Sequence, residues 1–175
     1  IFTKFLRMIS FSKNLYFFLS KHKSSIKANY VYASSPDLLT CLVGYFYSKK
    51  ISAKFIFEIR DIWPLSQVVL HGYSKFHPVV IFFRMIEKYL HRKADVVVSN
   101  LPNYRTYLTD HSISFSKYIY APQIVDLEFY KNNYSSKDDF LKDYNHIFEN
   151  HKNVGIYSGT IGSYYGIKHI VDALI

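Results

Sequence analysis

The sequence FIFEIRDIWP at residues 55–64 joins an apolar run to charged and aromatic residues. Residues 55–59 are predicted to form a buried strand, because the run is apolar and rich in the residue types that strands favour. Arg60, Asp61 and the pair Trp63-Pro64 follow at the point where this strand ends. Three costly residue types at one strand end indicate either a structural cap or a binding site.

Around this stretch, segments with the hydrophobic pattern of strands alternate with segments that have the hydrophobic pattern of helices. Strands are predicted at 29–34, 55–59, 95–99 and 118–120, and helices at 35–49, 78–93 and 104–109. Ser35 is expected to cap the first of these helices, with Pro36 in its first turn. In the helix at 78–93 the predicted core face holds Val79, Phe82, Phe83, Ile86 and Leu90, and the polar face holds Arg84, Glu87, Lys88 and His91. The alternation predicts an α/β fold with a Rossmann-like, doubly wound and mainly parallel sheet.

Polar residues follow several of the predicted strands. Ser34 and Ser35 follow the first, Arg60 and Asp61 the second, and Asn100 the third. In open α/β sheets, ligands bind beyond the carboxyl ends of the strands, so these side chains are candidates for a binding cleft. The structural alternative is a local ion pair between Arg60 and Asp61, with Asp61 capping the next turn.

The charge of the chain favours anionic partners. The 22 Lys and Arg residues against 13 Asp and Glu give a formal charge of +9, and no acidic residue precedes Asp37. The basic, aromatic start is either a core helix with a solvated basic face or a helix on an anionic membrane surface. Lys13 and Asn14 interrupt its apolar residues too early for a spanning helix. A single cysteine, Cys41, excludes an internal disulfide and fits a reducing compartment.

The end of the sequence has a different pattern. Residues 127–150 are polar and read as a connector, and a strand is predicted at 154–158, followed by a glycine turn and an amphipathic helix. Gly159, Gly162 and Gly166 allow close approach of the backbone, and free amides at a helix start can bind phosphate. The spacing matches neither the dinucleotide fingerprint nor the Walker loop.

Four segments together resemble a known family. FEIRDIWP, IEKYLHRKADVVVSN, IVDLEFY and VGIYSGTIGSYYGIKHIVDAL are similar to segments of the retaining glycosyltransferases of family four, in the branch that builds bacterial capsule and O-antigen sugars. The resemblance implies the GT-B architecture of two Rossmann-like domains. It assigns residues 1–126 to the acceptor-side domain, 127–150 to the connector and 151–175 to the first βα unit of the nucleotide-sugar domain, so we expect the chain to be a fragment.

The resemblance also implies roles for single residues. Arg60 stands where many members have a histidine beside the donor sugar, and Asp61 and Trp63 match this branch, so Arg60 and Asp61 are the candidate catalytic residues. Gly159, Thr160 and Gly162 match the loop near the donor diphosphate, and the expected cleft or acceptor residues are Ser34, Ser35, Trp63 and Asn100. The sequence departs from the family at Thr160 and Tyr165, where many relatives have basic residues, and at Gln123-Ile124, where a typical relative has Asn-Gly.

The implied reaction moves a sugar from a nucleotide-diphosphate sugar to a lipid-linked or glycan acceptor, with retention at the anomeric carbon and without a metal or cofactor. The implied partners are the nucleotide sugar, the acceptor and the anionic inner face of the plasma membrane, with the protein cytoplasmic and peripheral. Relatives contact the donor through two glutamates spaced by seven residues, and this sequence has no such segment. We therefore expect the chain alone to be inactive.

Two other functions stay open at this point. A nucleic-acid-binding module would also interleave basic and aromatic residues, as residues 1–32 do, although the resemblance implies no nucleic-acid partner. A non-catalytic relative that scaffolds a polysaccharide assembly complex is the third possibility. The eight histidines lack the spacing of a metal site, and Cys41 in an apolar helix is expected to be a core residue.

Overall fold

The computed structural model describes residues 2–132, 144, 146–147, 149, 155, 157–159 and 166–173, without the side chains of residues 2–4 and 130. The chain divides into two compact units, Ile1–Gln123 and Ile124–Ile175, which are described separately. The first unit has 17 Lys and Arg residues against 6 Asp and Glu, an excess of 11 positive charges. The basic character of the protein is therefore confined to this unit.

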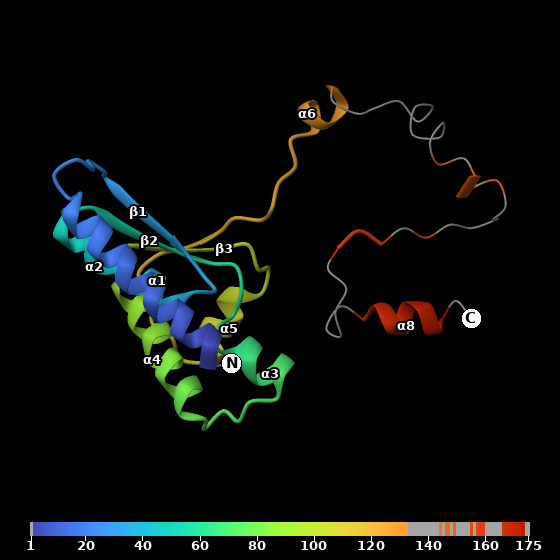
Figure 1. The fold of residues 1–175 in the computed structure, drawn as a ribbon, viewed down its shortest axis with the longest axis horizontal. Helices are drawn as coiled ribbons and strands as arrows, with labels where there is room; N and C mark the ends of the chain where they lie inside the picture. The colour runs from blue at the N-terminus through green and yellow to red at the C-terminus, as the bar shows by residue number, and fades with distance from the viewer. Residues whose placement is uncertain are drawn as a thin grey trace. The chain divides into compact units, whose positions relative to one another are not determined.

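The first unit is an α/β domain built on a four-stranded sheet (Figure 1). Its elements are α1 (Phe2–Lys21), β1 (Tyr30–Ser34), α2 (Leu38–Lys50), β2 (Lys54–Ile59), α3 (Leu65–His71), α4 (Pro78–Lys93), β3 (Val96–Ser99), α5 (Tyr104–Asp110) and β4 (Tyr118–Tyr120). The strand order is β1-β2-β3-β4, and all three pairings are parallel. The α/β class, the parallel sheet and the four predicted strands are confirmed.

Helices cover only one face of this sheet in the described residues. Phe55 contacts Tyr45 of α2, and Phe57 contacts His91 of α4. Tyr118 contacts Tyr104 of α5, and the register places Tyr118 on the same face as Phe57. On the other face Tyr30, Tyr32 and Ile119 are exposed. The predicted doubly wound sheet is therefore not present here, because right-handed crossovers that always advance in one direction leave every helix on the same face.

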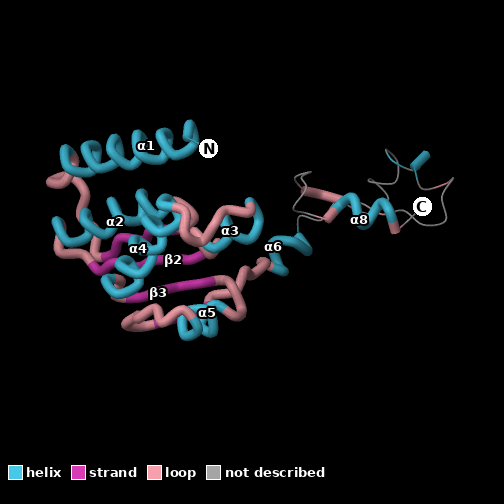
Figure 2. Tube along the Cα trace, turned by 90° about the horizontal axis from the view of Figure 1, so that it is seen from below, coloured by secondary structure: helices cyan, strands magenta, loops and turns pink. Residues whose placement is uncertain are grey.

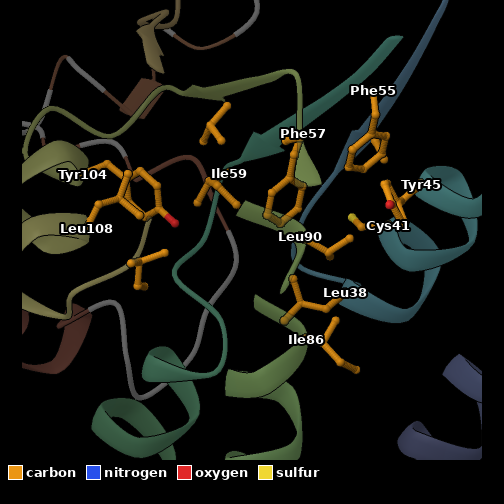
Figure 3. Close-up of a cluster of buried hydrophobic side chains, with 14 of the residues drawn as sticks. Leu38, Cys41, Tyr45, Phe55, Phe57, Ile59, Ile86, Leu90, Tyr104 and Leu108 are labelled. Atoms are coloured by element: carbon orange, nitrogen blue, oxygen red, sulfur yellow. The ribbon is translucent and has the colours of Figure 1, made fainter. Parts of the chain in front are cut away.

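The core lies between the sheet and these helices (Figure 3). Phe55, Phe57 and Val97 are fully buried and supply its sheet side. The helices contribute Leu38, Cys41, Tyr45, Phe83, Ile86, Leu90, Tyr104 and Leu108, among others. The prediction that Cys41 is a core residue is confirmed, because its side chain is fully buried. This burial raises the pKa of its thiol to about 12.

Helix α1 forms a further layer outside α2 (Figure 2). Its inner side is fixed by a 3.3 Å hydrogen bond between the hydroxyls of Ser12 and Thr40 and by an edge-to-face contact between Phe5 and Phe83. The outer side leaves large apolar residues exposed, among them Leu6, Phe11, Tyr16, Phe17 and Phe18. None of the described helices is both long enough and apolar enough to cross a bilayer.

The start of α2 differs from the prediction. Asp37, and not Ser35, is the N-cap: its Oδ1 accepts hydrogen bonds from the backbone amides of Leu39, at 3.0 Å, and Thr40, at 3.2 Å. The carboxylate of Asp37 satisfies two amides that have no partner within the helix. Pro36 lies before the helix, in a cis peptide bond with Ser35. Ser35 is thus released for a different role.

Gly44 lies where α2 packs closely against the sheet. A Cβ atom at this position would lie 3.2 Å from the Cβ of Ala33 and 3.7 Å from the ring of Phe55. Replacing Gly44 with leucine is therefore expected to lower the free energy of unfolding by about 2 kcal/mol through overpacking. Chemical denaturation would measure this loss, and an unchanged midpoint would show that the helix can move away from the sheet.

The second unit contains two short described helices, α6 (Leu127–Asn132) and α8 (Ile167–Asp172). Gly166 caps α8 in the left-handed conformation, with φ of 66°, which glycine adopts without strain. The helix predicted after the glycine turn is confirmed. The strand predicted at 154–158 is wrong at Gly155, Tyr157 and Ser158, which are not in a strand.

Candidate functional site

The polar residues predicted to face a ligand meet at the carboxyl edge of the sheet. Ser34 ends β1, Arg60 follows β2 directly, and Asn100 follows β3. Because the strands are parallel and adjacent, these positions lie at the same edge. The structure thus groups the predicted candidates of the first unit, and their side chains show what each can do.

The hydroxyl of Ser35 ties the ends of β1 and β2 together. Its Oγ accepts hydrogen bonds from the backbone amides of Arg60, at 3.0 Å, and Asp61, at 3.3 Å, and donates to the carbonyl of Asp61 at 3.2 Å. The residue is 3% exposed. A hydroxyl with three backbone partners has no capacity left for a ligand. Ser35 therefore holds the backbone of Arg60 and Asp61 in position. Its direct contact with an acceptor, which the resemblance implied, stays a prediction.

Replacing Ser35 with alanine tests this positioning role. The variant leaves two backbone amides without their acceptor, which is expected to lower the free energy of unfolding by about 1–2 kcal/mol. Amide hydrogen exchange should accelerate at Arg60 and Asp61. Ser34→Ala is the matched control, because the Ser34 hydroxyl only donates to the adjacent carbonyl of Ser35. Equal exchange rates in the two variants would contradict the role.

Arg60 and Asp61 have different surroundings. Arg60 is exposed and lies near Tyr32: partial loss of hydration at the Tyr32 hydroxyl and the carboxylate of Glu58 raise the pKa of that hydroxyl, and the Arg60 guanidinium lowers it. The carboxylate of Asp61 is half-buried and accepts a 3.3 Å hydrogen bond from the Ser66 hydroxyl at the start of α3. Among the described residues, Arg60 and Asp61 do not form the ion pair that the structural alternative required. The two side chains are thus arranged to contact different groups.

Trp63, in the turn that follows Asp61, packs against the hydrophobic core. Its ring lies edge-to-face against Phe83 of α4, with 4.3 Å between ring centroids. Together with Phe5 and Met8 it lines a cavity of about 310 Å³ between α1, α3 and α4. The contact with Phe83 anchors the turn that follows Asp61, and the role of Trp63 as a cleft or acceptor residue stays a prediction.

Asn100 has an unsatisfied polar atom. Its Oδ1 is buried and has no hydrogen-bond partner in the described part of the chain. The hydroxyl of the neighbouring Ser99 is bound to the backbone on two sides: its Oγ donates to the carbonyl of Ile59 at 2.9 Å and accepts from the amide of Leu101 at 3.1 Å. A buried acceptor without a donor costs folding free energy, so a hydroxyl of a ligand or a water molecule is expected to donate a hydrogen bond to it. Asn100 remains a candidate for binding.

The sequence did not predict a buried polar network beneath this edge. Glu87 and His91 were placed on the polar face of the helix at 78–93, but both are buried. Tyr107 Oη donates to Glu87 Oε1 at 3.0 Å, Tyr104 Oη donates to His91 Nε2 at 2.8 Å, and His91 Nδ1 donates to the carbonyl of Glu87 at 2.7 Å. The spacing of Glu87 and His91, one helical turn apart, was the only hint in the sequence.

Burial changes the proton affinities in this network. It raises the pKa of Glu87 to about 7 and lowers the pKa of His91 to about 4, since both charged forms lose hydration. Oε2 of Glu87 is buried without a partner among the described residues. Both side chains are therefore mostly uncharged in mildly acidic solution, which suits a core position.

The predicted phosphate-binding residues are described only in part. The side chain of Tyr157 lies close to Gly159: a Cβ atom at Gly159 would be 2.9 Å from the Tyr157 hydroxyl. Thr160 and Gly162 lie outside the described residues. Among the residues that are described, no three His, Cys, Asp or Glu side chains are grouped as metal ligands would be.

No protein family model and no curated protein matches the chain. The function must therefore be argued from the geometry of the site and the resemblance of its motifs.

Proposed function

We propose that the chain is part of a retaining glycosyltransferase of the GT-B type, and that the carboxyl edge of its sheet faces the cleft where sugar and acceptor meet. The observation that carries the proposal is the junction at Ser35, which uses three hydrogen bonds to fix the backbone of Arg60 and Asp61. Precise placement of an exposed guanidinium and a half-buried carboxylate is typical of a binding site.

The chemistry divides between the two charged side chains. The guanidinium of Arg60 is always protonated, so it cannot act as a base, but it can hold a phosphate or sugar hydroxyls. The carboxylate of Asp61 keeps acceptor capacity beside its bond to Ser66 and can orient a hydroxyl of the acceptor or sugar. Asn100 Oδ1 offers a further acceptor at the same edge.

The electrostatics of the first unit support an anionic substrate. Its excess of 11 positive charges favours the approach of a nucleotide diphosphate. During sugar transfer, negative charge grows on the leaving diphosphate, and cationic side chains and amides stabilise that charge without a metal ion. The acceptor that we propose is lipid-linked or a glycan, and the site of action is the cytoplasmic face of the membrane.

A release assay tests the proposal on the protein as its gene encodes it. The enzyme is incubated with a panel of nucleotide-diphosphate sugars and a bacterial lipid extract, and free nucleoside diphosphate is measured. We expect release with one or a few donors that increases when the lipid extract is added. A folded protein that releases no diphosphate from any donor would contradict the proposal.

A further inference from the structure

A groove of about 610 Å³ lies between α2 and α4, far in sequence from the junction at Arg60 and Asp61. Its lining includes Leu42 and Phe46 from α2, and Phe82, Met85, Lys88 and Arg92 from α4. The sequence placed Phe82 on the core face, yet it is exposed, and Met85 is 67% exposed. The floor of this α4 groove is therefore apolar surface that the fold leaves in contact with water.

Two cations border the apolar floor. Lys88 and Arg92 are four residues apart, so they lie on the same side of α4. Both are exposed, and neither takes part in an ion pair of the described residues. The acidic residue of this helix, Glu87, is buried against Tyr107 and does not reach the surface. Unneutralised positive charge thus stands directly beside hydrocarbon.

The same composition continues into a second hollow of about 470 Å³. It shares Met85 and Lys88 with the α4 groove and adds Lys75, Phe76 and Ile81. Phe76 is 73% exposed, and the ammonium of Lys75 lies 5.1 Å from the centre of its ring. An exposed phenylalanine beside a lysine extends the apolar and cationic surface beyond the helix.

We propose that the α4 groove and the adjoining Phe76 surface dock onto a bilayer that contains anionic phospholipid. Lys88 and Arg92 meet the lipid phosphates, and Phe76, Phe82 and Met85 enter the boundary between headgroups and acyl chains. Interfaces with folded proteins are depleted of charge at their centre, whereas this surface places Lys75, Lys88 and Arg92 among its apolar residues. Anionic lipid satisfies both features, because basic side chains reach its phosphates while their stems lie on hydrocarbon.

Sedimentation with vesicles tests the proposal without any nucleotide sugar, so it is independent of the sugar-transfer proposal. The vesicles are phosphatidylcholine alone or phosphatidylcholine mixed with phosphatidylglycerol. The protein should bind the mixed vesicles, and Lys88→Gln with Arg92→Gln should weaken that binding about thirtyfold, since each basic residue contributes about 1 kcal/mol near an anionic surface. Phe76→Ser with Met85→Ser should also weaken it. Equal binding to the neutral vesicles would overturn the proposal.

A matched pair of variants separates a defined surface from net charge. Arg105→Gln with Lys117→Gln removes the same two charges from exposed positions elsewhere in the first unit. We expect this control to lose far less affinity than the pair at Lys88 and Arg92, and an equal loss would overturn the proposal. Complete displacement by soluble glycerol phosphate, or tighter binding to a single-stranded oligonucleotide through Lys88 and Arg92, would also overturn it.

Discussion

Replacing Asp61 with asparagine is expected to lower the rate of sugar transfer at least about a hundredfold, the usual scale for losing a positioned polar group, while leaving the fold intact. The side chains have the same shape, and an asparagine oxygen can still accept the 3.3 Å hydrogen bond from Ser66. The charge and one acceptor are lost where the substrate is proposed to bind. Turnover of the protein as its gene encodes it, measured with the donor found in the release assay, checks this.

Two further variants distinguish a catalytic role of Asp61 from a structural one. Ser66→Ala removes only the hydrogen bond that the carboxylate accepts and should change turnover far less. Arg60→Lys keeps the charge but removes the planar fork, so it should also reduce activity. If Asp61 is only a cap, Asp61→Asn lowers the free energy of unfolding by about 1 kcal/mol or less and transfers sugar at the original rate.

Replacing Glu87 with glutamine is expected to stabilise the protein in a pH-dependent way. The folded-state pKa of Glu87, about 7, lies above its ordinary value of 4.5 because the side chain is buried. The native protein thus keeps a proton that the unfolded chain has lost. The stability from protonated Glu87 is present below pH 4.5 and is lost as the pH rises to about 7. Glutamine resembles the protonated form and keeps an acceptor for Tyr107.

The expected size of this effect follows from the shift. Two and a half pKa units correspond to about 3 kcal/mol, so the variant should be more stable than the original by roughly that amount at about pH 8 and nearly equal to it at about pH 4.5. Chemical denaturation at the two pH values measures the difference. Asp110→Asn, at an exposed carboxylate, is the control and should show no such growth. A difference that is constant with pH would contradict the burial of a neutral Glu87.

Local patterns were enough to predict the four strands of the first unit and most of its helices. The apolar run at 55–59 and the β-branched residues before Ser99 have few alternatives to a buried strand, and both form one. The side of α4 that meets the core was predicted in part: Phe83, Ile86 and Leu90 are buried as expected, but Val79 and Phe82 are exposed. The burial of Glu87 and His91 could not be predicted, because it depends on Tyr104 and Tyr107. These two residues of α5 supply the hydrogen bonds that allow Glu87 and His91 to be buried.

The candidate site was predicted in position but not in role. Adjacent parallel strands bring Ser35, Arg60, Asp61 and Asn100 to one edge, which the topology implies. The Ser35 hydroxyl accepts hydrogen bonds from amides that lie 25 and 26 residues further along the chain. This pairing depends on the three-dimensional path of the chain, which local patterns do not contain. In the residues that the structure describes, the prediction of helices on both faces was wrong, because the pattern of elements does not contain the order of the strands.

The anomeric configuration of the transferred sugar tests the central claim most directly. The purified product of the reaction between an α-linked nucleotide sugar and the lipid acceptor can be examined by proton NMR, in which the coupling constant of the anomeric proton reports its configuration. A retaining glycosyltransferase predicts an α linkage in the product. A β linkage, or a folded enzyme that forms no glycosidic product, would contradict the account.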